Sequence, residues 1–472
     1  MVIILLSTIF YFENFDSLPP NVRPSPTDTE RIPYPLSSYG FSSNVSEDTL
    51  LSAFITVHEE YTPLNGDNAG LYTWFTHGRF SLWFMDRVSD SSGYAERKVR
   101  VVKDDTFMVE FSIWVNRLEG KVYLFRPMVS GEDYGCYLAL AGFNTDSSYD
   151  SLVFEIGYGD GVDTISVRRK IPIVSNIRYP WHKIQLFFIK GEVTFYCDAE
   201  SLTTFDWAQI KYFNSFSLGT FEPEDEGEIF FDDFIITGVP HGEHPRLFFD
   251  RDELDSLRYY IYTHFTDPLP VGVTYAELFE RAEEFIMYNN YPALLRENYN
   301  GYFSSISHAL NLELKMLLSV LMPGEPEGYS EYYEEIDSVK NTAVNWVSWD
   351  MLLTGSSGGV KRYGAFCKSN ILEMYTLLYD WFFDSLTTYE KMNIQNACLV
   401  HGAFQNLQGV FRLVEHKYWL YGSTPPINYP ARELGPTGLF FLVLDDTTFS
   451  SKWIRKSREW SMRIHRRETK DA

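Results

Sequence analysis

The chain has 472 residues and a formal net charge of −24 at pH 7, because 64 Asp and Glu outnumber 40 Lys and Arg. This acidic balance excludes nucleic acid as a partner, since binding to phosphate requires a basic surface. The length exceeds one ordinary hydrophobic core and predicts two domains. Aromatic residues make up 17% of the chain, which is high. They fill large cores or, where exposed, offer flat faces on which sugar rings stack.

The first twelve residues, MVIILLSTIFYF, have two interpretations. They resemble the apolar region of a signal peptide, although no Lys or Arg precedes them and no small-residue cleavage site is evident. Alternatively, their second half is the first strand of a β domain. No later segment reaches the roughly 18 uninterrupted apolar residues of a membrane span. We therefore expect a secreted or extracellular protein without an integral membrane span.

Up to about residue 240, short segments alternate between polar and apolar residues or are rich in aromatic and β-branched residues, which is typical of strands. The predicted strands cover residues 51–57, 70–76, 79–85, 98–102, 107–115, 121–127, 135–141, 152–158, 164–168, 181–189, 192–197, 215–219 and 228–237. Turn pairs such as Asn65-Gly66 and Asp160-Gly161 separate them, and residues 17–35 are rich in Pro, Ser and Thr, which predicts an irregular loop. So many short strands predict an antiparallel two-sheet β-sandwich.

After residue 240 the apolar residues recur with a helical period. The predicted helices cover residues 250–264, 274–288, 302–321, 329–352, 365–383, 388–414, 431–444 and 449–463. Asp250, with Glu253 three residues later, forms a capping-box pattern, and Thr274 is the expected cap of the second helix. Loops are expected at residues 354–359 and 423–430. Successive helices with short connections are typical of stacked helical hairpins.

Four cysteines, Cys136, Cys197, Cys367 and Cys398, match no CxxC metal-binding pattern. Two fall in each predicted domain, so one disulfide per domain is an alternative to buried free thiols. We favour the free thiols. There is no HExxH, GxSxG or P-loop motif, and the glycine-rich run GYGDG at residues 157–161 is expected to be a hairpin turn because neither Lys nor a helix follows it.

The β half resembles a concanavalin A-like or laminin-G-like jelly roll. The opening residues FENFD at 12–16 and the closing residues IFFDDFIITG at 229–238 carry this resemblance. The segments WHKIQL at 181–186 and VTFYCD at 193–198 match the late strand pair of that fold. The resemblance implies a jelly-roll architecture and does not imply a particular ligand.

The helical half resembles the N-terminal part of heparinase II/III-like polysaccharide lyases, which fold as an incomplete (α/α) toroid of helical hairpins. The matching residues are HPRLFF at 244–249, followed by DEL at 252–254, and LYDWFFDSLT at 378–387. The two resemblances imply a β-sandwich over residues 12–240, after a signal or first-strand segment at 1–11. They also imply a partial toroid over residues 241–472.

The lyase resemblance implies β-elimination on glycans that contain uronic acid. That chemistry neutralises the substrate carboxylate, removes the C5 proton with a Tyr or His and protonates the leaving oxygen. In this sequence Asn428 corresponds to the residue that neutralises the carboxylate, and His416 and Tyr418 are the candidate bases. The substrate-binding candidates beside them are Trp419, Tyr429, Arg432 and Glu433.

Two departures from the family pattern leave an alternative. The segment PPINYPARE at 425–433 has one Asn and three prolines where the family shows a run of Asn with aromatic or His residues. The family also carries its bases further along, in later helices and a C-terminal β domain, and this sequence ends at Ala472. The sequence thus resembles a truncated or inactive lyase relative. The alternative function is a non-catalytic carbohydrate-binding or cell-surface structural protein. Asn428 also fits a loop or cap role, and Arg432 a solvated surface role.

Glu13, Asp16, Asp232 and Asp233 are candidate ligands of a structural Ca²⁺. Jelly rolls often hold their first and last strands together with hard oxygen ligands, and carboxylates from the two ends would otherwise repel each other. The alternative is that they are solvated residues at the sheet edge. We expect no other cofactor, and the expected partner is a polysaccharide.

Overall fold

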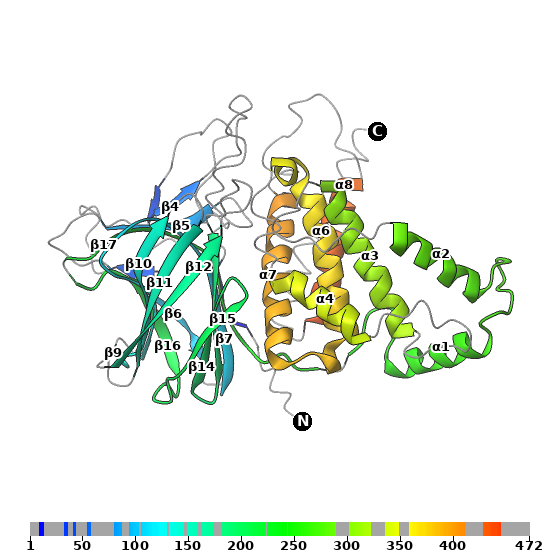
Figure 1. The fold of residues 1–472 in the computed structure, drawn as a ribbon, viewed down its shortest axis with the longest axis horizontal. Coiled ribbons are helices and arrows are strands. Elements are labelled where there is room, and N and C mark those ends of the chain that lie inside the picture. Colours follow the sequence, from blue (N-terminus) through cyan, green and yellow to red (C-terminus); the bar gives the residue numbers. More distant parts are fainter. Residues whose placement is uncertain are drawn as a thin grey trace. The chain divides into compact units, whose positions relative to one another are not determined.

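The computed structural model describes residues 9–13, 33–35, 41–43, 54–57, 80–86, 94–102, 105–129, 132–145, 149–158, 163–172, 181–288, 302–321, 336–348, 358–410 and 428–444, apart from 223 and 243. The chain divides into two compact units, one made mainly of Thr8–Val239 and the other beginning at Pro240. The first unit holds the strands and the second holds the helices (Figure 1).

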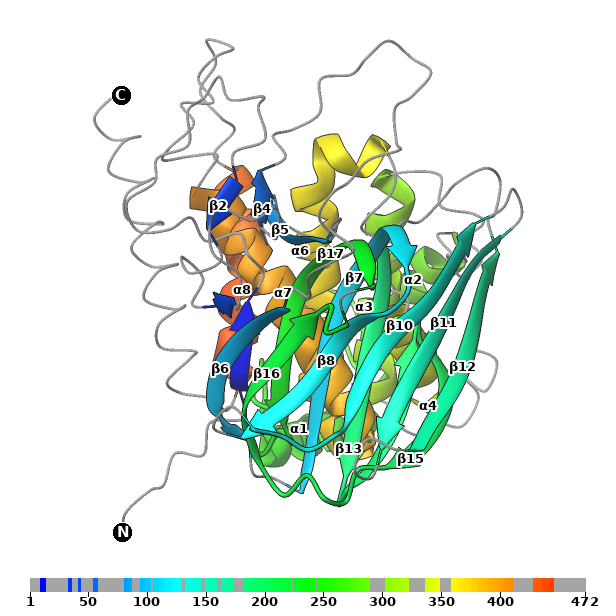
Figure 2. The ribbon, with the colours of Figure 1, turned by 90° about the vertical axis from the view of Figure 1, so that its left-hand side faces the viewer.

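The described strands pair antiparallel throughout and form two sheets. The order in sheet A is β15 (Glu200–Asp206), β14 (Glu192–Cys197), β13 (Trp181–Ile189), β7 (Thr106–Glu119), β17 (Glu226–Gly238), β5 (Phe80–Asp86), β4 (Phe54–Val57) and β2 (Pro33–Pro35), and β1 (Ile9–Glu13) also pairs with β17. The order in sheet B is β12 (Asp163–Pro172), β11 (Tyr149–Tyr158), β10 (Tyr137–Thr145), β8 (Val122–Val129), β16 (Phe213–Gly219), β6 (Tyr94–Val102) and β3 (Phe41–Ser43), and β9 (Glu132–Asp133) pairs with β8. Figure 2 shows sheet B nearest the viewer.

The core of the sandwich contains a stack of aromatic rings from both sheets, packed among aliphatic side chains. Phe234 of β17 stacks on Phe111 of β7 at a centroid distance of 4.7 Å and on Phe216 of β16 at 4.5 Å. All three side chains are fully buried. Because β17 belongs to sheet A and β16 to sheet B, this stack joins the inner faces of the two sheets. Burial of each such ring contributes about 1.5–3 kcal/mol.

Four of the described strands were not predicted from the sequence. Strand β15 was not predicted because it lies at a sheet edge and alternates weakly, with only Phe205 buried along its length. The short strands β2, β3 and β9 were also missed. The predicted strand at residues 70–76 lies outside the described residues. Near the N-terminus, Ile9–Glu13 forms strand β1, which agrees with the interpretation of that segment as a first strand.

The described helices of the second unit are α1 (Arg251–Thr263), α2 (Tyr275–Tyr288), α3 (Tyr302–Leu321), α4 (Ile336–Ser348), α6 (Gly358–Trp381), α7 (Thr388–Val410) and α8 (Asn428–Val443), with a 3₁₀ turn, η2 (Phe383–Ser385), between α6 and α7. Helix α6 packs against α3, α4, α7 and α8. None of the described helices is both long and apolar enough to span a membrane. The predicted fold class, a two-sheet sandwich followed by a helical region, is confirmed. The toroid arrangement stays a prediction.

Two helices begin earlier than predicted. Helix α6 begins at Gly358, inside the predicted loop 354–359, and α8 begins at Asn428, inside the predicted loop 423–430. The early start of α8 is compatible with Pro430, because a proline in the first helical turn lacks only an N–H that would have no helical partner. Helix α4 is shorter than predicted, and the predicted helix at 449–463 lies outside the described residues.

The described cysteines are free thiols. Cys136 and Cys197 in the sandwich are both buried and unbridged, and so is Cys398 in α7. The alternative of a disulfide between the two cysteines of the sandwich is therefore wrong. Nothing is described of the side chain of Cys367.

Candidate functional site

The outer face of sheet B carries several polar and aromatic side chains on its central strands. On β8, Val122 and Leu124 point into the core, so Tyr123 between them points outward. The same alternation places Tyr137 of β10 and Glu155 of β11 on the outer face, between core residues. Strand pairing sets Ala139 of β10 opposite both Tyr123 and Glu155, so these outward residues are neighbours across three strands. These strands lie side by side in Figure 2.

One carboxylate oxygen on this face accepts two hydrogen bonds. The Tyr137 hydroxyl donates to Glu155 Oε1 at 2.7 Å, and Lys121 Nζ forms an ion pair with the same oxygen. Among the described residues no partner contacts the second oxygen, Oε2. The Lys121 and Glu155 side chains are 27% and 23% exposed, so solvent reaches this group. The carboxylate therefore has a fixed position and an oxygen available to a ligand.

The shared hydrogen bonds change three pKa values in the same cluster. Burial raises the pKa of Glu155, but the hydrogen bonds from Lys121 and Tyr137 outweigh it and the pKa lies below its usual value. Burial lowers the pKa of Lys121, but the hydrogen bond to Glu155 and the nearby negative charges outweigh burial, so the pKa lies above its usual value. Burial, together with the hydrogen bond to Glu155, raises the pKa of Tyr137 far above the usual value for tyrosine. Tyr137 therefore keeps its proton and acts as a hydrogen-bond donor.

Aromatic rings continue from Tyr137 across the sheet. Tyr137 contacts Tyr123 edge to face, with ring centroids 4.8 Å apart, and Tyr123 contacts Phe221 in the same way at 4.8 Å. Phe221 then stacks on Tyr94 of β6, with centroids 4.8 Å apart and an interplanar angle of 11°. The guanidinium carbon of Arg126 lies 4.5 Å from the Phe221 ring centroid, a cation–π distance. We call these residues, with Lys121 and Glu155, the sheet B cluster.

The sheet B cluster combines flat apolar faces with hydrogen-bonding groups of both kinds. It offers a carboxylate as acceptor, a lysine as donor and a guanidinium beside an aromatic ring, while the single O–H of Tyr137 is already donated to Glu155. The Tyr123 and Tyr137 side chains are each 9% exposed. Such a set suits a ligand with one apolar face and several hydroxyl groups. It does not suit proton abstraction, since a tyrosine base needs a lowered pKa and that of Tyr137 is raised.

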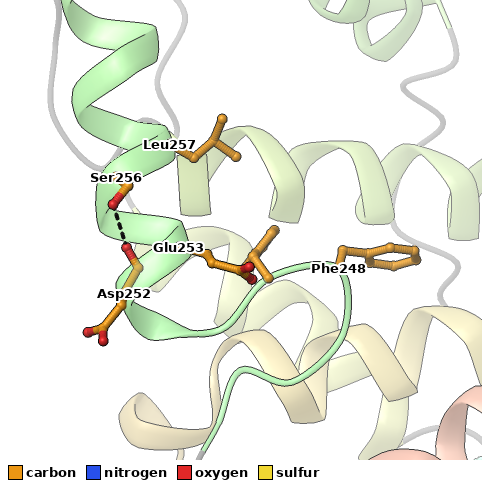
Figure 3. Close-up of a pocket in the computed structure, with 6 residues that line it drawn as sticks. Phe248, Asp252, Glu253, Ser256 and Leu257 are labelled. Carbon is orange, nitrogen blue, oxygen red and sulfur yellow. Dashed lines mark hydrogen bonds between the residues drawn. The ribbon is translucent and has the colours of Figure 1, made fainter.

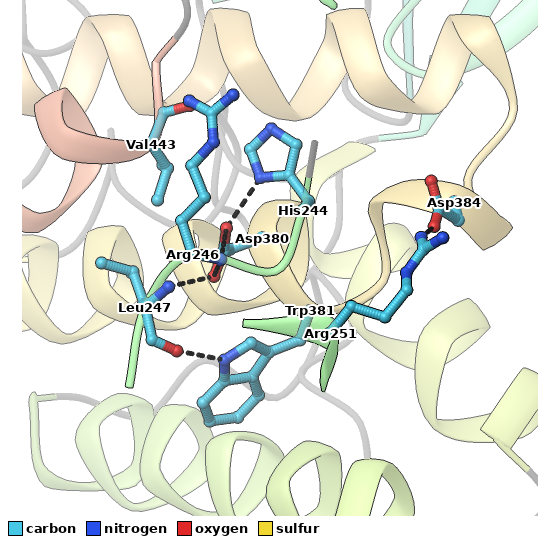
Figure 4. Close-up of polar contacts among 8 residues, drawn as sticks. All are labelled: His244, Arg246, Leu247, Arg251, Asp380, Trp381, Asp384 and Val443. Carbon is cyan, nitrogen blue, oxygen red and sulfur yellow. Dashed lines mark hydrogen bonds and ion pairs between the residues drawn. The ribbon is translucent and has the colours of Figure 1, made fainter. Parts of the chain in front are cut away.

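In the helical unit, Asp380 of α6 binds the segment that precedes α1 (Figure 4). Its carboxylate accepts hydrogen bonds from His244 Nδ1 at 2.7 Å, from the Arg246 backbone N–H at 3.0 Å and from the Leu247 N–H at 2.8 Å. The His244 and Asp380 side chains are fully buried. Trp381 Nε1 also donates to the Leu247 carbonyl at 3.4 Å. This network fixes the backbone and offers no surface to a ligand.

An open pocket lies where this segment enters α1 (Figure 3). Its lining consists of Phe248, Phe249, Asp252, Glu253, Ser256 and Leu257. Glu253 belongs to the capping box of α1, and the Ser256 hydroxyl donates to the Asp252 carbonyl at 2.8 Å. Two of its polar groups thus serve the hydrogen bonding of the helix itself, and we assign no function to the pocket.

The lyase residues predicted from sequence lie only partly within the described chain. Asn428, Tyr429, Arg432 and Glu433 belong to the first turns of α8, and their backbone is helical. His416, Tyr418 and Trp419 lie outside the described residues. The proposed roles of all seven stay predictions.

Of the predicted Ca²⁺ ligands, Glu13 lies in strand β1, and Asp232 and Asp233 lie in β17. These strands pair, with Glu13 opposite Phe234, next to Asp233. Asp232 and Asp233 are 1% and 3% exposed at a bulge of β17, and Asp232 Oδ1 accepts the Asp233 N–H at 2.8 Å. Asp16 lies outside the described residues, among which no group of three or more His, Cys, Asp or Glu side chains could hold a metal. The Ca²⁺ site stays a prediction.

The sequence interpretation missed the sheet B cluster. The available signal was a tyrosine or a charge at alternate positions of segments already predicted as strands, as at Tyr123 and Glu155. That pattern identifies an outward face but not which strands are neighbours. Phe221 lies outside the predicted strands altogether.

No family model and no curated protein matches the chain. Among solved structures, a carbohydrate esterase from the Shiga toxin-encoding bacteriophage phi24B is similar at 14% identity and a TM-score of 0.27, over 43% of this chain and 92% of that one. An alginate lyase from Zobellia galactanivorans is similar at 12% identity and a TM-score of 0.26, over 38% of this chain and 84% of that one. A Bacillus subtilis protein with a galectin-like fold is similar at 13% identity and a TM-score of 0.25, over 34% of this chain and 82% of that one. Similarities of this strength assign neither a substrate nor a reaction to the chain.

Proposed function

We propose that this protein binds carbohydrate on the outer face of sheet B. The observation that carries the proposal is the continuity of the sheet B cluster. A solvent-accessible carboxylate with two donors on one oxygen adjoins the rings of Tyr137, Tyr123, Phe221 and Tyr94. A glycan partner agrees with a secreted or extracellular location, which we propose with it.

The physical match is between the two faces of a sugar and the two kinds of group in the cluster. A pyranose ring has C–H bonds that pack on aromatic faces, while its hydroxyls need acceptors and donors at fixed positions. Glu155 Oε2 is an acceptor whose carboxylate is already oriented by Lys121 and Tyr137. Pre-orientation lowers the entropy lost on binding.

A glycan array probed with the full chain tests this proposal. We expect binding to at least one glycan, weakened about 3- to 10-fold by Phe221→Ala, because a ring contact contributes about 0.5–1.5 kcal/mol. Tyr212→Ala is the matched control, since Tyr212 is an aromatic residue of the same unit that is 46% exposed and outside the cluster. Binding to no glycan, or equal loss in both variants, would contradict the proposal.

A second candidate function is uronate β-elimination in the helical unit. The observation that favours it is that the two motifs of the lyase resemblance contact each other, since Asp380 of the second motif binds His244, Arg246 and Leu247 of the first. In this proposal Asn428 neutralises the substrate carboxylate and His416 or Tyr418 removes the proton. Trp419, Tyr429, Arg432 and Glu433 contact the substrate.

Incubation with alginate, heparan and ulvan-type polymers separates the two candidates. A lyase produces unsaturated uronate, which absorbs in the ultraviolet, and Asn428→Ala should abolish the rise. Glycan binding without any rise, unaffected by Asn428→Ala, would favour the non-catalytic carbohydrate-binding protein and remove the lyase.

A further inference from the structure

Phe221 reaches the sheet B cluster from a connecting segment rather than from a strand. It lies between β16 and β17, and its ring contacts Tyr94 of β6 and Tyr123 of β8. We call residues 220–225 the strap; Pro223 in it lies outside the described residues. The position of the Phe221 ring therefore depends on what holds the strap.

Asp225 at the end of the strap holds it to another turn. Asp225 Oδ1 accepts the backbone N–H of Lys121 at 2.9 Å, and the Asp225 N–H donates to the Glu222 carbonyl at 3.1 Å. Asp225 is 6% exposed, and its Oδ2 is buried with no hydrogen-bond partner among the described residues. Lys121 thus contacts both the strap and Glu155: its backbone N–H donates to Asp225, and its side chain pairs with Glu155.

The turn before Lys121 leaves room for Asp225 only because it contains glycine. Gly120 has φ +86°, a conformation that other residues rarely adopt. A Cβ at this position would lie 2.3 Å from Asp225 Oδ1 and 3.1 Å from Asp225 Cα. Any larger residue at position 120 would push the strap away from the turn.

We infer that Asp225 is a positioning residue, which holds the strap so that Phe221 completes the carbohydrate site. The inference rests on the proposed function. Asp225 is anchored by the Lys121 N–H and acts on the ligand through the Phe221 ring, and it is not itself placed against the ligand.

The raised pKa of Asp225 makes Asn, a neutral residue of the same shape, a suitable test. Burial raises the pKa of Asp225, and the negative charges of Glu224 and Glu222 raise it further. The hydrogen bond and the positive charge of Lys121 lower it, but the net result is a raised pKa. A carboxyl with a raised pKa is favoured in its neutral form by the fold, and Asn offers the same acceptor without charge. Asp225→Asn should therefore keep the strap in place, whereas Asp225→Ala removes the acceptor.

A double-mutant cycle on the full chain tests the inference. We expect Asp225→Ala to weaken glycan binding about as much as Phe221→Ala, and to add less than twofold in the Phe221→Ala background, because both act through one ring. Asp225→Asn should bind within twofold of the unmodified chain. Gly120→Ala should match Asp225→Ala. Gly272→Ala is its control, since Gly272 has φ +79° with nothing within 4 Å of the added Cβ.

Hydrogen exchange of the Lys121 amide provides a readout independent of the ligand. Protection should fall in Asp225→Ala and Gly120→Ala and persist in Asp225→Asn and Gly272→Ala. Unchanged protection in Asp225→Ala, or a full additive loss of affinity in the double variant, would overturn the inference. If the unmodified chain binds no glycan, the proposed function and the effect on affinity fail together, while the amide measurement still decides whether Asp225 holds the strap.

Discussion

Asp380 of α6 and Asp384 of η2 lie four residues apart and contribute very differently to the helical unit. Asp380 is fully buried and accepts hydrogen bonds from three residues before α1, whereas Asp384 is 64% exposed and pairs with Arg251. Removing a buried charge partner leaves donors without an acceptor, but exposed ion pairs contribute little.

We therefore expect Asp380→Ala to lower the free energy of unfolding of the helical unit by about 3–5 kcal/mol. Asp384→Ala, the matched control, should change it by less than about 0.5 kcal/mol. Chemical denaturation followed by tryptophan fluorescence measures both. Similar losses in the two variants would show that the buried network is not a major source of stability.

In the sheet B cluster, Tyr137→Phe should raise the pKa of Glu155 toward its usual value, because one donor to the carboxylate is lost. The pKa of Glu155 is lowered in the folded protein, so the fold favours its ionised form. The ionised Glu155 stabilises the sandwich above its unfolded pKa, and this contribution disappears as the pH falls through the folded pKa. Tyr137→Phe should therefore make stability less dependent on pH in the acid range.

Carboxyl carbon NMR titration of Glu155 measures this shift directly. Tyr134→Phe is the control, since the Tyr134 hydroxyl donates to the Tyr212 carbonyl rather than to a carboxylate. An unchanged Glu155 titration in Tyr137→Phe would mean that Lys121 alone sets its pKa.

At the scale of single elements, the starts of α1 and α2 were predicted accurately because each carries a capping signal. The capping box of α1 has both of its hydrogen bonds, Glu253 N–H to Asp250 Oδ1 at 2.8 Å and Asp250 N–H to Glu253 Oε2 at 3.1 Å. Thr274 forms the same reciprocal pair with Glu277 before α2. Such signals involve residues three apart and need no tertiary contact, which is why the sequence reveals them.

Asp250→Ala should destabilise α1 by about 1 kcal/mol, since the Glu253 N–H loses its acceptor. Asp255→Ala on the same helix removes only a surface ion pair with Arg258 and should cost a few tenths of a kcal/mol. Hydrogen exchange across α1 measures the difference. Equal protection in the two variants would argue that tertiary packing, rather than the cap, determines where this helix starts.

At the scale of the whole molecule, the net charge of −24 should make stability depend on salt. Like charges repel each other more in the compact state than in the unfolded chain, and salt screens this repulsion. We expect the Tm to rise as NaCl increases to about 0.5 M at neutral pH. The slope should flatten near pH 4.5, about where Asp and Glu begin to be protonated. A Tm that falls with salt would show that attractive ion pairs outweigh the net repulsion.

The amino-acid sequence by itself determined the strand-rich first part, the helices after residue 240 and the capped starts of α1 and α2. Each depends on spacing within a few residues, which is visible along the chain. Only the tertiary structure decided that Lys121, Tyr137, Glu155 and Phe221 meet on one face, because strand order and register bring them together from four separate segments. An alternating strand reveals which residues point outward, but its neighbours are selected by the packing of both sheets around one core.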